Sequence, residues 1–270
     1  MTFRARRLAT IAFVAFLVAA LAPAATATDA ATQEAIVAAE KGAFTLTNKR
    51  RAEHGLVALQ WDARVAALAR ERAEYMAATG RFSHTEADGS NVFDDIADAG
   101  LTWYGAGEII AWNTAGDLQF SAAFAVKQWM ESSGHRAIVL SSGYNYVAFG
   151  MAISPTTNKR YWAGVYLKGP DRTGAWAKVA SVRKTNLDAT RVKVTVDWTG
   201  NDTKLQVLTS GLRYYQFSRR YDGGTWLDYP VQTESAMTRT WNRNRTYEFR
   251  VRARDKAGNW GSWRWIKIST

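Results

Sequence analysis

Residues Trp129–Leu140 read WMESSGHRAIVL, and this stretch decides how the first half of the chain folds. The apolar stripe of a helix that starts near Asp117 ends here, and Gly134 breaks the helix. His135 falls where a new short helix would begin. Trp129 continues the apolar stripe, so we expect Trp129 in the core and His135 at a candidate site.

Two further residues are candidates for the same site as His135. His84 lies in the polar turn FSHTEADGS, and Glu108 lies in GAGEII between the two histidines. Imidazoles and carboxylates are ligands that zinc accepts, and three protein ligands plus a water is a common catalytic arrangement. The three residues form no local motif, so the residues alone leave a second interpretation open, in which both histidines bond loop backbone.

Glu108 itself is unusual, because an extended strand would place it on the same face as Ile110 and Trp112. An unpaired carboxylate on an apolar face is costly. We therefore expect Glu108 either to lie at the end of its strand in a cleft or to have a cationic partner.

The first 27 residues have the basic start, apolar run and small-residue end of a secretory signal peptide. The rest of the sequence predicts no transmembrane helix in the mature chain. The chain has no cysteine, which excludes a disulfide framework and any thiolate nucleophile or thiolate metal site. It also lacks a GxxxxGK[ST] or GxGxxG phosphate-binding loop, and we expect no nucleic-acid partner.

Two other catalytic arrangements find little support in the sequence. Ser132 and Ser133 lie close to His135, but neither is in the GxSxG turn that positions a nucleophilic serine. Glu108 and Glu131 form a candidate pair of carboxylates for glycoside hydrolysis, whose separation the sequence does not give.

The positive charge is concentrated beyond a Gly- and Pro-containing linker at residues 169–174. Residues 171–270 contain 19 Lys and Arg against 9 Asp and Glu, and the net charge of the whole chain is +11. This imbalance favours docking on an anionic polymer, although a solvated basic face is the simpler alternative. Apolar residues alternate in Arg191–Trp198 and in Tyr247–Ala253, with turn residues between the strands, which is typical of a β-sandwich.

Several motifs, taken together and in order, resemble one known family. They are LTNKRRAEHGLVALQWD, FSHTEADGS, GAGEII, WMESSGHRAIVL and YNYVAFGMAI, and they cover most of residues 30–168. This part resembles a bacterial SCP-like member of the CAP superfamily (cysteine-rich secretory proteins, antigen 5 and pathogenesis-related 1). The resemblance implies an α-β-α sandwich with a central cleft in an extracellular protein.

The family's cleft usually has two histidines and two acidic residues, and in some members it binds zinc or another divalent cation. By motif position, the resemblance assigns His84, Glu108 and His135 to such a metal site. The second acidic residue often lies three residues after the tryptophan, where this chain has Ser132; Glu131 lies one position early. Ile109 and Ile138 replace two asparagines that are common in the family, so the surroundings are less polar than usual.

The C-terminal part resembles a fibronectin type III-like domain, through DWTG at Trp198 and YEFRVRARDKAGNWGSW. The resemblance makes Tyr247 the tyrosine-corner residue and Trp198 a core residue.

These observations predict an α+β chain: a CAP-type α-β-α sandwich followed by an all-β immunoglobulin-like or fibronectin type III-like sandwich. The predicted parts are a signal peptide (1–27), a CAP domain (28–170) and a fibronectin type III-like domain (171–270). We expect a secreted, cell-wall-associated protein that binds a lipid, metal or cell-surface component through its cleft, with Glu131 and Ser132 as cleft neighbours. The alternative is a metal-dependent extracellular hydrolase acting on peptide or cell-wall substrates.

Overall fold

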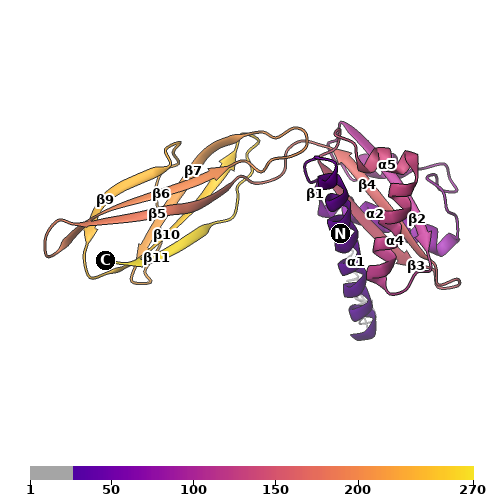
Figure 1. Cartoon of the computed structure of the whole chain (residues 1–270), viewed down its shortest axis with the longest axis horizontal. Coiled ribbons are helices and arrows are strands. Elements are labelled where there is room, and N and C mark those ends of the chain that lie inside the picture. Colours follow the sequence, from indigo (N-terminus) through magenta and orange to yellow (C-terminus); the bar gives the residue numbers. More distant parts are fainter. Residues whose placement is uncertain (1–26) are drawn as a thin grey trace, which may run out of the picture.

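The computed structural model describes residues 27–270, and their side chains from residue 32. The predicted signal peptide lies outside the described residues, apart from Ala27, which begins the first helix. The described chain has two parts, a helix-and-sheet part followed by an elongated β-strand part, with a connection between residues 168 and 176 (Figure 1).

The described residues of the first part form five helices. They are α1 (Ala27–Glu53), α2 (Ala63–Thr79), α3 (Val92–Asp98), α4 (Leu118–Glu131) and α5 (Ser133–Val139). Asp62, Asn91 and Asp117 accept backbone N–H groups at the starts of α2, α3 and α4. The sequence predicts the break at Gly134, but Gly134 lies inside α5; Ser132 ends α4 and precedes α5, so the change of helix falls there.

A four-stranded sheet lies between these helices. It contains β1 (Gln60–Trp61), β2 (Gly105–Asn113), β3 (Tyr146–Ile153) and β4 (Arg160–Lys168), in the order β1-β3-β4-β2. β4 is antiparallel to both of its neighbours, and β1 pairs in parallel with β3. Apolar residues of α1 and α4 pack on one face, and those of α2 and α3 pack on the other. The first part is therefore a mixed α/β unit with three layers, as the sequence predicts.

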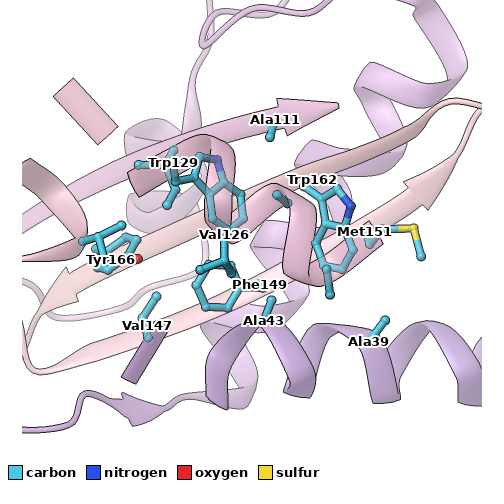
Figure 2. Packing of buried hydrophobic residues seen from close by; sticks show 14 of the residues in the cluster. Ala39, Ala43, Ala111, Val126, Trp129, Val147, Phe149, Met151, Trp162 and Tyr166 are labelled. Carbon is cyan, nitrogen blue, oxygen red and sulfur yellow. The ribbon is translucent and has the colours of Figure 1, made fainter. Parts of the chain in front are cut away.

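Trp129 is fully buried in the layer between the sheet and helices α1 and α4, which confirms its predicted place in the core. Its ring stacks on that of Phe149 from β3, with centroids 5.3 Å apart. Figure 2 shows Trp129 and Val126 together with sheet residues, and Ala43 on the neighbouring helix.

Gly150 marks the closest approach of a helix to the other face of the sheet. A Cβ atom at this position would lie 2.2 Å from backbone atoms of Ala69 and Arg70 in α2. Only glycine permits this packing distance, which places α2 directly on β3.

The second part consists of two sheets that share one core. One sheet has the order β11-β10-β7-β8 and the other β5-β6-β9. Their bounds are β5 (Trp176–Asn186), β6 (Arg191–Asn201), β7 (Leu212–Tyr221), β8 (Leu227–Asp228), β9 (Ala236–Asn242), β10 (Thr246–Asp255) and β11 (Arg264–Ser269).

The inward faces of β6 and β10 are the predicted ones. Val192, Val194, Val196 and Trp198 are at most 3 % exposed, and so are Tyr247, Phe249, Val251 and Ala253. Trp198 stacks on Phe217 of the facing sheet, with centroids 5.2 Å apart. The strands β5, β8 and β9 were not predicted as separate elements. On β11, Ile268 packs against the core while Trp265 is exposed.

Polar contacts connect the two parts near the linker. Arg51 of α1 is fully buried and donates to the carbonyls of Val139 and Ser141, at 2.8 and 2.7 Å. Its other terminal nitrogen donates to Gln206 Oε1 of the second part at 3.2 Å. Arg172 of the linker forms an ion pair with Asp62 at 2.7 Å. None of the described helices has the length and apolarity that a membrane crossing requires.

Candidate functional site

His84 and Glu108 contact each other directly. His84 Nδ1 lies 2.6 Å from Glu108 Oε2, although the two residues come from a loop and from β2. The Glu108 side chain is 3 % exposed, while that of His84 is 53 % exposed. A carboxylate at one ring nitrogen fixes the orientation of an imidazole and leaves the other nitrogen, Nε2, free to bind a ligand.

Arg72 of α2 is the cationic partner that the position of Glu108 requires. Its Nε donates to Glu108 Oε1 at 3.0 Å, and the Arg72 side chain is fully buried. Both oxygens of Glu108 therefore have partners within the protein, one with Arg72 and one with His84.

The same guanidinium holds the loop that carries His84. Arg72 also forms an ion pair with Glu86 and donates to the carbonyl oxygen of Ser83 at 3.1 Å. These contacts lie on either side of His84 in the chain, so Arg72 positions the histidine through its neighbours as well as through Glu108.

His135 lies in the first turn of α5 and is half-buried. Its ring centroid is 6.5 Å from that of His84, with the ring planes inclined by 58°. Burial, and then the neighbouring His84, lower the pKa of His135 below its ordinary value. A lowered pKa keeps this imidazole neutral, which is the form that binds metal.

Two cavities lie beside this histidine pair. The larger, of about 540 Å³, is lined by His135 and by apolar side chains that include Phe82, Trp112 and Phe124. The smaller, of about 340 Å³, is lined by His84 and Glu108, with Phe93 and Ile138 among its apolar residues. Each histidine therefore faces a different cavity, and the pair lies between the two.

The two predicted cleft neighbours lie in different surroundings. Ser132 lines the larger cavity together with His135. The side chain of Glu131 is 65 % exposed and lies 3.7 Å from Lys127 on the same helix. Glu131 lines neither cavity, whereas Glu108 lines the smaller one and is paired with Arg72 of α2.

The two histidines could act as ligands of a divalent metal ion. His84 and His135 offer one imidazole nitrogen each, and Glu108 orients His84 from behind. Among the described residues, these three do not form a group with all ligand atoms within 4.8 Å of one another. The histidine pair would hold the ion, with Glu108 behind His84 rather than on the metal.

Arg72 is the functional residue that sequence reasoning missed. Its position follows Ala69 by three residues and precedes Met76 by four, so it lies on the apolar face of α2. A charged residue at a core-facing position is the signal that would have identified it. The third histidine, His54, is exposed and contacts the carbonyl of Arg50 at 2.8 Å, near the end of α1.

The two isoleucines at positions of common family asparagines have different roles. Ile109 is fully buried in the core between the sheet and α1 and α4, whereas Ile138 lines the smaller cavity beside Glu108. The wall next to the site is therefore apolar at Ile138.

The family comparison covers most of the first part of the chain. Residues 44–166 match the model of the cysteine-rich secretory protein family, CAP. An uncharacterized membrane protein of Bacillus subtilis, YlbC, is 30 % identical over 129 residues, which are 48 % of this chain and 34 % of that protein. YkwD, an uncharacterized protein of the same organism, is 31 % identical over 125 residues, which are 46 % of this chain and 47 % of that protein. The matched residues span less than half of either relative.

Solved structures with detectable similarity include bacterial proteins. An extracellular protein containing an SCP domain from Bacillus anthracis is 22 % identical with a TM-score of 0.44, over 54 % of this chain and 45 % of that one. An outer surface protein from Borrelia burgdorferi is 18 % identical with a TM-score of 0.43, over 48 % of this chain and 92 % of that one. The family match, residues 44–166, lies within the three-layer first part of the chain.

Proposed function

We propose that this chain is a secreted ligand-binding protein that attaches to a cell surface. In this proposal residues 28–170 form the binding domain, and His84 and His135 hold zinc or another divalent cation. Residues 171–270 form a fibronectin type III-like module that docks on an anionic cell-wall polymer. The observation that carries the proposal is the histidine pair between two cavities, with His84 oriented by Glu108.

The larger cavity supports a ligand with an apolar portion. Its aromatic wall begins next to His135, and Phe82 and Trp112 are 45 % and 39 % exposed there. Desolvation of such a wall is favourable by about 25 cal/mol per Å² of apolar surface. A lipid, with its polar end at the histidine pair and its chain along the aromatic wall, is the ligand class that fits best.

The arrangement favours binding over metal-dependent hydrolysis. A hydrolase needs a general base that can reach a water molecule. Glu108 is buried, and both of its oxygens have partners within the protein. Glu131 is exposed beside Lys127 and lines neither cavity. If the wild type hydrolysed peptide or peptidoglycan and Glu108→Gln did not, hydrolysis and not binding would be the function.

A polar cavity of about 230 Å³ supports docking by the second part. It is lined by Arg219, Arg245 and the rings of Tyr221, Trp241 and Tyr247. Arg245 pairs with Asp222, whereas the guanidinium of Arg219 lies 5.3 to 5.7 Å from three ring centroids. Within the described residues Arg219 has no carboxylate partner, so its charge is available to an anionic group of a polymer.

The type III-like assignment of this module is supported by Tyr247. Its hydroxyl donates to the carbonyl of Asn242 at 3.2 Å, five residues upstream. This is the bond that defines a tyrosine corner in sandwiches of this kind.

Zinc titration of the metal-free full chain tests the first part of the proposal. The wild type should bind zinc by calorimetry, and the double variant His84→Ala/His135→Ala should not. His54→Ala is the matched control, because it removes an exposed histidine that contacts the carbonyl of Arg50, its neighbour in the sequence. Absence of zinc binding by the wild type would overturn the metal site.

Retention on purified cell walls tests the second part. Arg219→Gln should weaken retention and reduce its sensitivity to salt, since a cavity charge is lost. Arg239→Gln removes the same charge from an exposed position outside the cavity and should have a smaller effect. If both variants lost retention equally, the general positive charge of the surface, and not this cavity, would be responsible for docking.

A further inference from the structure

Three carboxylates from distant positions in the sequence meet where the linker joins the second part. Asp171 lies in the linker after β4, Asp202 directly follows β6, and Asp255 is the last residue of β10. Each offers an oxygen atom, and these atoms all lie within 4.8 Å of one another. The three residues are 8 %, 6 % and 0 % exposed, so each is at least nine-tenths buried.

The partners of these carboxylates are neutral. Asp171 accepts from Thr173 and from the backbone N–H of Ser210, and Asp255 accepts from the backbone N–H and side-chain amide of Asn259. Asp202 Oδ2 accepts from the Ser210 hydroxyl at 3.1 Å and the Gly211 N–H at 2.5 Å. Over residues 32–270, none of the three belongs to an ion pair with lysine, arginine or histidine.

One oxygen of this group is left without any partner. Asp202 Oδ1 is fully buried, and no hydrogen-bond donor among the described residues reaches it. A buried, unpaired carboxylate oxygen is costly because it has lost its water and gained nothing in return. Burial raises the pKa of Asp202, and the like charges of Asp171 and Asp255 act in the same direction. The group therefore has an excess of negative charge and a free ligand atom.

We propose that Asp171, Asp202 and Asp255 bind one Ca²⁺ ion. Carboxylate oxygens are hard ligands, and calcium takes six to eight oxygens, of which backbone carbonyls and waters supply the remainder. Magnesium retains its waters and demands near-octahedral geometry, and zinc prefers nitrogen and sulfur ligands. The site differs in place and in chemistry from the histidine pair of the first part.

The ion connects three segments that are far apart in the sequence and have no covalent cross-link between them. Asp171 brings the linker, while Asp202 and Asp255 bring the ends of two strands that lie in different sheets. Asn259, which contacts Asp255, also donates to the carbonyl of Asp171 at 3.0 Å. Calcium therefore stabilises the second part and fixes the direction in which the linker leaves it.

Calcium titration of the full chain after removal of metals tests this site. We expect one Ca²⁺ per chain by calorimetry and a rise of several degrees in the Tm of the second part at saturating calcium. Asp202→Asn should lose both effects, and Asp171→Asn serves as a second variant. Glu234→Gln, an equal charge change at an exposed position, and His84→Ala/His135→Ala should both keep them.

The chelated protein provides the decisive comparison. In EDTA, Asp202→Asn should unfold at a higher temperature than the wild type, because it removes one of three like charges. The proposal would be overturned if the wild type showed neither a heat of calcium binding nor a calcium-dependent rise in Tm. Calcium binding by Asp202→Asn would overturn it as well. If the wild type gains stability only when the pH is lowered, and not when calcium is added, the cluster shares a proton and the proposal is overturned.

Discussion

Arg72 Nε donates to Glu108 Oε1 at 3.0 Å, and the two side chains are 0 % and 3 % exposed. The pair is the structural base of the histidine site, because Glu108 orients His84 and Arg72 holds the loop on either side of it. A buried pair of this kind is sensitive to the removal of one partner, which leaves an uncompensated charge in the interior.

Replacement of Arg72 by methionine should therefore be severe. We expect Arg72→Met to lower the free energy of unfolding by about 3–5 kcal/mol, measured by urea denaturation. The double variant Arg72→Met/Glu108→Gln should recover part of that loss, because the buried charge is gone. Arg50→Met, which breaks an exposed pair with Glu53, should cost under about 1 kcal/mol. A similar small loss in Arg72→Met would show that Glu108 finds another partner.

Acidification should weaken metal binding at the histidine pair. The unperturbed pKa of histidine is about 6.5, and that of His135 is lowered by burial and by His84. Zinc affinity should therefore decline as the pH falls through the lowered pKa of His135, because a protonated imidazole does not bind metal. Calorimetric titrations across this range measure the decline, and an affinity independent of pH would exclude histidine ligands.

The same shift predicts how the stability of the metal-free protein depends on pH. The folded protein binds the His135 proton less tightly than the unfolded chain does, so this residue destabilises the fold as the pH falls below about 6.5. The loss should be complete below the lowered pKa of His135. In His135→Gln, denaturation at several pH values should show that this part of the dependence is absent.

Glycine substitutions should separate close packing from helix propensity. Gly150→Ala places a methyl group 2.2 Å from the backbone of α2 and should destabilise by about 3 kcal/mol or more. Gly134→Ala meets nothing within 4 Å and lies in α5, so it should be neutral or stabilise by up to about 1 kcal/mol. Thermal unfolding of both variants gives the comparison, and equal effects would contradict the packing of α2 on β3.

Gln206→Ala should loosen the two parts relative to each other. Gln206 Oε1 accepts from Arg51 and from the backbone N–H of Val57, at 3.2 and 2.8 Å. Without these bonds, small-angle X-ray scattering should give a broader distribution of distances between the parts. Lys204→Ala, a nearby exposed substitution, should leave the distribution unchanged.

The helices and strongly alternating strands could be predicted from the sequence because their residues show the period of the element. β6 and β10 alternate cleanly, since each buries one whole face. β5 and β9 do not, because most of their residues are exposed and carry no apolar period. Such strands at the edge of a sheet form because they pair with a neighbouring strand, and a single sequence does not show this pairing.

Part of the candidate site also followed from the residues. His84, Glu108 and His135 stand out in the sequence because they are imidazole and carboxylate side chains at the ends of predicted elements. The expectation that Glu108 has a cationic partner is confirmed by Arg72. The sequence could not show that Glu108 stands behind His84, since this depends on how α2 packs on the sheet. Glu131, one position from the family pattern, lies on the exposed side of α4 because one residue rotates a helix by about 100°.

Arg51 gives the molecule a mechanical connection. One nitrogen of its guanidinium holds the carbonyls at the end of α5, and the other contacts Gln206 in the second part. Beside the covalent linker and the Arg172–Asp62 pair, this side chain therefore gives a direct contact between Gln206 and the end of the helix that carries His135. A change in how the second part sits on the first would thus reach the end of α5, the helix of His135, through one guanidinium.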